Sequence, residues 1–168
     1  MTLEPEISLI KNFYGDKTAK RSGVPLINHI NEGLIVLDFI KASDIAKKAY
    51  CLHPLVQSDE NLLLYADSLQ NLDSRVLIAA MEYRNIANAH LSHRKITYLD
   101  EIKLSPLKAV NDMLIADKIQ NRKDFEIYHK DRHERSDELD CYFRDWLRRL
   151  GILEDVYNEI KEILKNGK

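Results

Sequence analysis

Apolar residues recur at steps of three and four along most of the chain, which is the spacing of one face of an α-helix. The segments with this spacing are 7–14, 26–42, 45–52, 61–69, 75–94, 105–130, 143–150 and 152–164. Only five glycines and four prolines interrupt the chain, and no run shows the alternation of a strand or a hairpin. The pattern therefore predicts an all-α protein of about seven or eight helices, folded as a single domain over residues 1–168.

Capping residues and prolines indicate where several of these helices begin and end. Ser105 is expected to cap segment 105–130, with Pro106 at its first helical position. We expect the helix that starts at Ser43 or Asp44 to end at the His53–Pro54 pair. The reason is that proline lacks an N–H donor and restricts the residue before it.

The helix predicted over 105–130 changes character along its inward face. Leu107, Val110 and Leu114 begin that face, and Asp117, Asn121, Asp124 and Tyr128 continue it. An acid on a line that points toward a core is costly unless it is paired, hydrogen-bonded or bound to a metal ion. Two interpretations stay open. In the first, Asp117 turns to solvent or pairs with an arginine. In the second, it belongs to a site.

Polar residues gather in two other places. Segment 75–94 carries Arg84, Asn85 and Asn88, which either form an exposed face or line a polar cavity. The loop after the first helix carries Lys20 and Arg21, which are either solvated or bind phosphate, because both supply donors to an anionic oxygen.

Composition and charge restrict the classes of function. A formal net charge of -2 gives no reason to expect non-specific nucleic-acid binding. No apolar run approaches the length of a membrane span, and the acidic N-terminal segment lacks the layout of a signal peptide. Cys51 and Cys141 follow no disulfide pattern, so we expect reduced thiols and a cytoplasmic protein with no membrane partner.

Three pieces in residues 10–130 together resemble the hydrolase domain of the RelA/SpoT family, the HD-type (p)ppGpp phosphohydrolases. They are the stretch GVPLINH, which ends in His29, the stretch AYCLH, which ends in His53, and the stretch LIADKIQN, which holds Asp117 and Asn121. The resemblance implies an HD-like helical bundle in which His29, His53 and Asp117 bind a divalent metal and Asn121 contacts substrate.

The chain departs from that family at the metal motif. The His-Asp doublet of the family reads His53–Pro54 here, and the expected Glu-Asp pair reads Gln57–Ser58. Proline offers no ligand atom, so three metal ligands remain, and a hydrolytic site needs ligands plus an open position. Asp59 lies just beyond, and we expect it to serve as the replacement carboxylate in catalysis.

The resemblance and its departures leave several functional hypotheses. The chain is expected to be an HD-like nucleotide-binding protein with weak or no turnover. The alternatives are an active metal-dependent nucleotide phosphohydrolase, using manganese, zinc or iron, and a structural or protein-interaction domain. The partner expected in the first two cases is a phosphate-bearing nucleotide, and the oligomeric state is left open. The substrate-binding residues expected around it are Lys20, Arg21, Arg84, Asn85, Asn88, Lys118, Arg122 and Tyr128.

Overall fold

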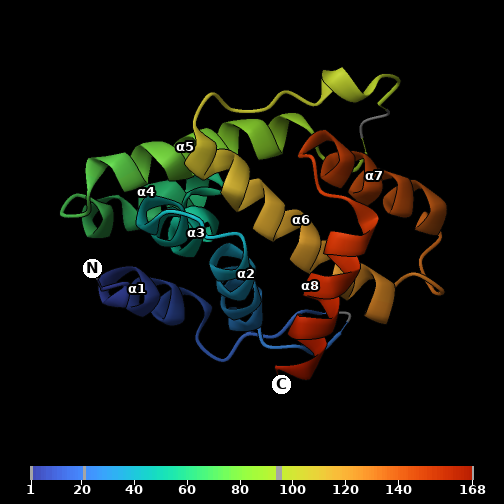
Figure 1. Ribbon diagram of the computed structural model, residues 1–168. Helices are drawn as coiled ribbons and strands as arrows, with labels where there is room; N and C mark the ends of the chain where they lie inside the picture. The colour runs from blue at the N-terminus through green and yellow to red at the C-terminus, as the bar shows by residue number, and fades with distance from the viewer. Residues whose placement is uncertain (1, 21, 94–95, 168) are drawn as a thin grey trace.

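The computed structural model describes residues 2–20, 22–93 and 96–167. Their elements, in chain order, are α1 (Glu4–Tyr14), α2 (Ile27–Phe39), α3 (Asp44–Val56), α4 (Asp59–Leu69), α5 (Ser74–Ala89), the 3-10 helix η1 (Leu99–Glu101), α6 (Lys108–Tyr128), α7 (Ser136–Arg149) and α8 (Glu154–Asn166) (Figure 1). Within these ranges the chain forms no β-strand beyond one isolated bridge between Thr18 and Pro25. The prediction of an all-α fold with about eight helices is confirmed.

Helices α3 and α4 each begin at a serine whose side chain satisfies one of the free N–H groups of the first turn. The hydroxyl of Ser43 accepts from the amide of Ala46 at the start of α3, and that of Ser58 accepts from the amide of Asn61 at the start of α4. Each of these bonds satisfies a donor that has no partner within its helix. At the end of α1, Gly15 adopts a φ of 51°, a left-handed conformation that favours glycine.

Three predicted helix ends were wrong. Helix α3 continues past Pro54 to Val56. Pro54 has no N–H to donate to the Tyr50 carbonyl, and His53 Nδ1, 2.6 Å away, donates to that carbonyl instead. Helix α5 ends at Ala89, before the basic end of segment 75–94. Helix α6 begins at Lys108, since the Ser105 hydroxyl accepts from the amide of Leu107 and holds a turn ahead of the helix.

Helix α6 runs diagonally through the bundle and contacts most of the other helices (Figure 1). It packs chiefly against α2, and α3 packs chiefly against α5, so these four helices enclose the main core. Apolar residues of α6 such as Val110, Met113 and Ile119 are fully buried there. Helices α7 and α8 cover the C-terminal half of α6. Asp117, Gln120 and Lys123 in the polar part of α6 face α2 inside the bundle, whereas Arg122 faces α8.

A membrane-crossing helix was not expected from the sequence. In the part of the chain that the structure describes, none of the helices combines the length and apolar character needed to cross a bilayer.

Candidate metal centre

Side chains from three helices meet at one point inside the bundle. They are His29 of α2, His53 of α3 and Asp117 of α6, and one ligand atom of each lies within 4.8 Å of the other two. His29 Nε2 is 3.2 Å from His53 Nε2 and 3.6 Å from Asp117 Oδ1. His53 and Asp117 are buried and His29 is partly exposed, so the cluster is open on the side of His29.

The hydrogen bond of His53 fixes the position of its proton. Its Nδ1 lies 2.6 Å from the carbonyl oxygen of Tyr50. A carbonyl oxygen can only accept, so Nδ1 carries the proton and neutral His53 presents a lone pair at Nε2. Burial, followed by the charge of His29, lowers the pKa of His53 to about 3, which keeps the ring neutral at pH 7.

The same reasoning applies to His29 through Gln120. The Gln120 amide nitrogen donates to Glu32 Oε2 at 3.2 Å and to Asp124 Oδ2 at 2.7 Å, both carboxylates that only accept. Its Oε1 must therefore face His29 Nδ1, which is 2.7 Å away and carries a proton. In its neutral form His29, like His53, presents a lone pair at Nε2.

Two lone pairs thus face each other across 3.2 Å, beside a carboxylate. Such groups repel one another unless a proton or a metal ion lies among them. Metal-binding histidines commonly donate the other ring N–H to a carbonyl or carboxylate, as both histidines do here. The donor set of two imidazole nitrogens and one carboxylate oxygen suits zinc, iron or manganese. The residues therefore fit a divalent ion.

Asp117 is held ionised by its neighbours on α6. Lys118 Nζ lies 2.8 Å from Asp117 Oδ2, and Asn121 Nδ2 donates to Oδ1 at 2.8 Å. Burial alone would raise the pKa of Asp117, but Lys118, His29 and His53 outweigh it and lower the pKa to about 2. The sequence left open whether Asp117 is solvated, paired or part of a site, and it is both paired with Lys118 and part of the cluster.

Three tyrosines surround the cluster. Tyr50 Oη is 3.3 Å from His29 Nε2 and 3.3 Å from the His29 carbonyl oxygen. A Cβ built on Gly33 would overlap the Tyr50 ring, so the ring can occupy this position only because residue 33 is glycine. Tyr14 and Tyr83 line the adjoining cavity, and burial, followed by the charge of Asp117, raises the pKa of each above its usual value.

The cluster lies at the edge of a cavity of about 520 Å³. Besides the three cluster residues, its lining includes Tyr14, Ala19, Leu26, Pro54, Gln57, Tyr83, Ala87, Leu91, Lys118, Gln120, Asn121 and Asp124. Among these described lining residues one cation, Lys118, stands against two carboxylates, Asp117 and Asp124. With neutral histidines this lining therefore carries about one net negative charge, from the ordinary charge states of these groups.

The expected positive rim is not formed by the described residues. Arg84 pairs with Asp59 on the surface, and the Asp59 side chain is 86% exposed, so Asp59 is not a replacement ligand. Asn85 is exposed and donates to Glu82, which corrects its placement in a cavity. Asn88 exchanges hydrogen bonds with Gln57, so it supports a residue of the cavity wall without being part of that wall.

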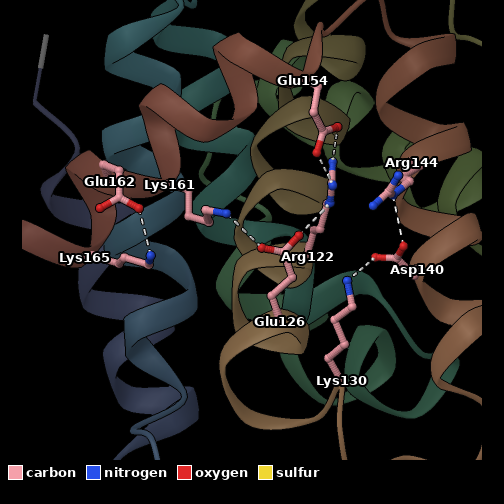
Figure 2. A network of polar contacts seen from close by, with 9 residues as sticks. All are labelled: Arg122, Glu126, Lys130, Asp140, Arg144, Glu154, Lys161, Glu162 and Lys165. Carbon is pink, nitrogen blue, oxygen red and sulfur yellow. Dashed lines mark hydrogen bonds and ion pairs between the residues drawn. The ribbon is translucent and has the colours of Figure 1, made fainter.

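Arg122 was expected to bind phosphate but lies in an ion-pair network on another side of α6 (Figure 2). Its guanidinium pairs with Glu126 at 3.0 Å and with Glu154, and it stacks over the ring of Tyr157. Only 1% of its side chain is exposed, so the group is not free to meet a ligand. Arg122 joins α6 to α8, which corrects the prediction.

The remaining predicted residues lie in different surroundings. Lys118 and Asn121 line the cavity as expected. Tyr128 lines a separate hollow beyond the end of α6, with His129 and Arg132, and not the metal cavity. Lys20 is exposed in the loop before α2, beside the lining residue Ala19. Arg21 lies outside the described residues.

Sequence reasoning missed the residues that orient the cluster. Gln120 could have been found, since it lies three residues after Asp117 and so shares its helix face. Gly33 is a glycine inside a helix, which usually marks a close approach of another group. Tyr50 lies one turn before His53, but nothing in its spacing separates it from a core residue.

Comparison with known proteins gives no relative for this chain. No protein-family model, curated protein or solved structure matches it.

Proposed function

We propose that this protein binds a divalent metal ion through His29, His53 and Asp117 and, through that ion, the phosphate of a nucleotide. The observation that carries the proposal is the pair of Nε2 lone pairs facing each other at 3.2 Å. The resemblance to HD-type (p)ppGpp phosphohydrolases, in the order and spacing of these residues, points the same way. Zinc, manganese and iron are the candidate ions.

Each residue of the cluster has a definite part in this proposal. The two histidines supply neutral nitrogens, whose direction is set by the Tyr50 carbonyl and by Gln120. Asp117 supplies the anionic oxygen, which Lys118 and Asn121 hold in place. A divalent ion bound there would polarise a phosphoryl oxygen and lower the pKa of a coordinated water.

The charge of the cavity makes phosphate binding depend on the metal. Asp117 and Asp124 outweigh Lys118 in the described lining, so the metal-free cavity repels an anion. A divalent ion reverses the sign of the local charge. We therefore expect a phosphate-bearing nucleotide to bind to the metal-loaded protein and not to the metal-free one.

Turnover is expected to be slow. A hydrolase of this kind needs a group that takes a proton from the attacking water. Of the two carboxylates in the described cavity lining, Asp117 is engaged by Lys118, and Asp124 by Gln120 and by Lys123 at 2.6 Å. Neither is free to act as a base, which favours binding over rapid hydrolysis.

The test is to strip the purified protein with a chelator and titrate it with Zn²⁺ or Mn²⁺, in calorimetry, with and without a panel of nucleotides. We expect one ion per chain, nucleotide binding only after metal loading, and loss of both in Asp117→Asn. The matched control is Asp112→Asn, because Asp112 is a buried acid of the same helix that pairs with Lys108.

Two results would refute the proposal. Absence of metal binding by the intact chain removes the site altogether. Equal nucleotide binding with and without metal would show that the nucleotide does not bind through the cluster. Fast hydrolysis by the metal-loaded protein would instead favour the phosphohydrolase alternative, and a release assay for phosphate and pyrophosphate on the same samples detects it.

A further inference from the structure

We propose that Tyr50 supplies a fourth ligand to the metal ion, which would then be held by His29, His53, Tyr50 and Asp117 through two nitrogens and two oxygens. The inference rests on the metal binding proposed above and adds a ligand that the histidine and aspartate pattern does not include.

The distances around His29 Nε2 are those of a four-coordinate site. His53 Nε2 is 3.2 Å away, Tyr50 Oη 3.3 Å and Asp117 Oδ1 3.6 Å. Ligand bonds of about 2.0–2.1 Å in a tetrahedral site place neighbouring ligand atoms roughly 3.3–3.4 Å apart. The three edges that meet at His29 Nε2 are therefore close to those of a tetrahedral site, and the ligand atoms of His29, His53 and Asp117 all lie within 4.8 Å of one another.

The hydroxyl of Tyr50 is poorly satisfied for a buried group. Tyr50 is 0% exposed, and both acceptors near its oxygen, the Nε2 and carbonyl oxygen of His29, lie at 3.3 Å. Hydroxyl hydrogen bonds are usually about 2.7–2.8 Å long, and buried polar groups normally have well-formed partners. The Tyr50 oxygen is buried, has two long contacts and lies beside the two Nε2 lone pairs. It is therefore well placed to bind a cation.

Two helices fix this oxygen in position. Tyr50 lies one turn before His53 on α3, so both side chains project from the same face. Gly33 of α2 removes the Cβ that would overlap the ring and its hydroxyl. The same α2 carries His29 one turn earlier, so the helix that supplies one ligand also makes room for another.

Coordination exchanges a proton for the ion. The O–H bond of Tyr50 breaks, a bond from its oxygen to the metal forms, and the proton passes to solvent. A phenolate and a carboxylate are hard, anionic oxygen ligands, and together with two imidazoles they suit iron, manganese or zinc better than soft ions. They also leave the ion less electron-poor, in agreement with slow turnover. The nucleotide phosphate would then enter as a fifth ligand, since such sites can expand to five-coordination.

The experiment uses the colour of phenolate bound to ferric iron. Chelator-stripped protein is titrated with Fe(III) citrate and its visible spectrum is recorded for the wild type, Tyr50→Phe, Tyr14→Phe and Tyr83→Phe. We expect a charge-transfer band in the wild type that is lost in Tyr50→Phe and kept in the two controls. Tyr50→Phe preserves the packed ring, and circular dichroism checks the fold of each variant.

Zinc affinity gives a second readout. Tyr50→Phe should weaken Zn²⁺ binding by more than the roughly 10–100-fold that loss of an outer hydrogen-bond partner costs. A crystal structure of the zinc-bound wild type avoids substitution, and we expect a bond from Tyr50 Oη to zinc of about 2.0–2.2 Å.

The outcomes separate this inference from the metal site itself. The fourth ligand is overturned, and the three-ligand site remains, if the wild type binds zinc but shows no charge-transfer band with ferric iron, and if Tyr50→Phe binds zinc with unchanged affinity. A band lost in Tyr14→Phe assigns the phenolate to Tyr14 and also overturns it. Absence of any metal binding overturns both proposals.

Discussion

A histidine can direct one nitrogen at a ligand only if its other nitrogen is held, and here two unlike acceptors do this. His53 is held by a backbone carbonyl, which is free because the residue one turn later is Pro54. The sequence predicts that Pro54 ends the helix and marks the loss of a metal ligand. It does remove a ligand atom, but the carbonyl it frees orients the ligand beside it.

Gln120 is the acceptor that orients His29, and its replacement tests that role. Gln120→Met keeps the size of the side chain but removes the oxygen that accepts from His29 Nδ1. We expect Zn²⁺ affinity to fall by about 10–100-fold, as for other partners of metal-binding histidines. Calorimetric titration measures the effect.

The control for that variant is Gln70→Met, an exposed glutamine that donates to Asp67 far from the cluster in sequence. It should bind zinc like the wild type. Equal affinities in both variants would show that Gln120 has no part in orienting His29.

At the scale of the helix, spacing along α6 could be used to predict part of the site. Gln120, Asn121 and Asp124 lie within about 60° of Asp117 around the helix, whereas Arg122 lies about 140° away. That angle alone argues against Arg122 as a cavity residue. The pair of Arg122 with Glu126 follows the i,i+4 spacing of one helix, which the sequence shows. The pair with Glu154 could not be predicted, because that acid comes from α8 and a contact between distant segments leaves no mark in helical spacing.

The contact between α2 and α3 depends on Gly33, and Gly33→Ala tests it. Alanine favours a helix over glycine by about 1 kcal/mol. A Cβ here would overlap the Tyr50 ring, however, and overpacking of this kind costs about 1–3 kcal/mol. We expect a net loss of stability in urea unfolding, together with weaker metal binding.

Gly167→Ala is the matched control, because its Cβ would meet its nearest neighbour at an ordinary 3.4 Å. An unchanged unfolding midpoint and metal affinity in Gly33→Ala would show that α2 can shift without disturbing Tyr50.

At the scale of the whole molecule, periodicity was enough to predict an all-α fold, because most of the described helices bury apolar residues spaced three and four apart. The basic and amide residues near the pocket were less predictable. Arg84 and Asn85 carry the groups that bind phosphate, yet the same groups pair as readily with a nearby acid, and here they do. Sequence alone does not tell which of the two partners is closer.

The buried neutral His53 makes the metal-free protein sensitive to acid. Its pKa is lowered from 6.5 to about 3 on folding, so between these values the unfolded chain binds more protons than the folded one. Stability must then fall as the pH is lowered below 6.5, by up to about 1.4 kcal/mol per pH unit for one proton. Urea unfolding in the presence of a chelator, between pH 7 and about 5.5, measures it above the range where most aspartates and glutamates titrate.

His53→Gln should flatten this slope, whereas His93→Gln, at an exposed position, should leave it unchanged. A slope that is the same in all three proteins would show that His53 is not the group responsible.

The negative charge of the metal-free cavity has a consequence for how the two ligands influence each other. If the ion is what permits the nucleotide to bind, thermodynamic reciprocity requires the nucleotide to tighten the ion by the same factor. Each ligand would then raise the occupancy of the other at a given concentration. The nucleotide-bound state of such a chain would form only where metal and nucleotide are present together.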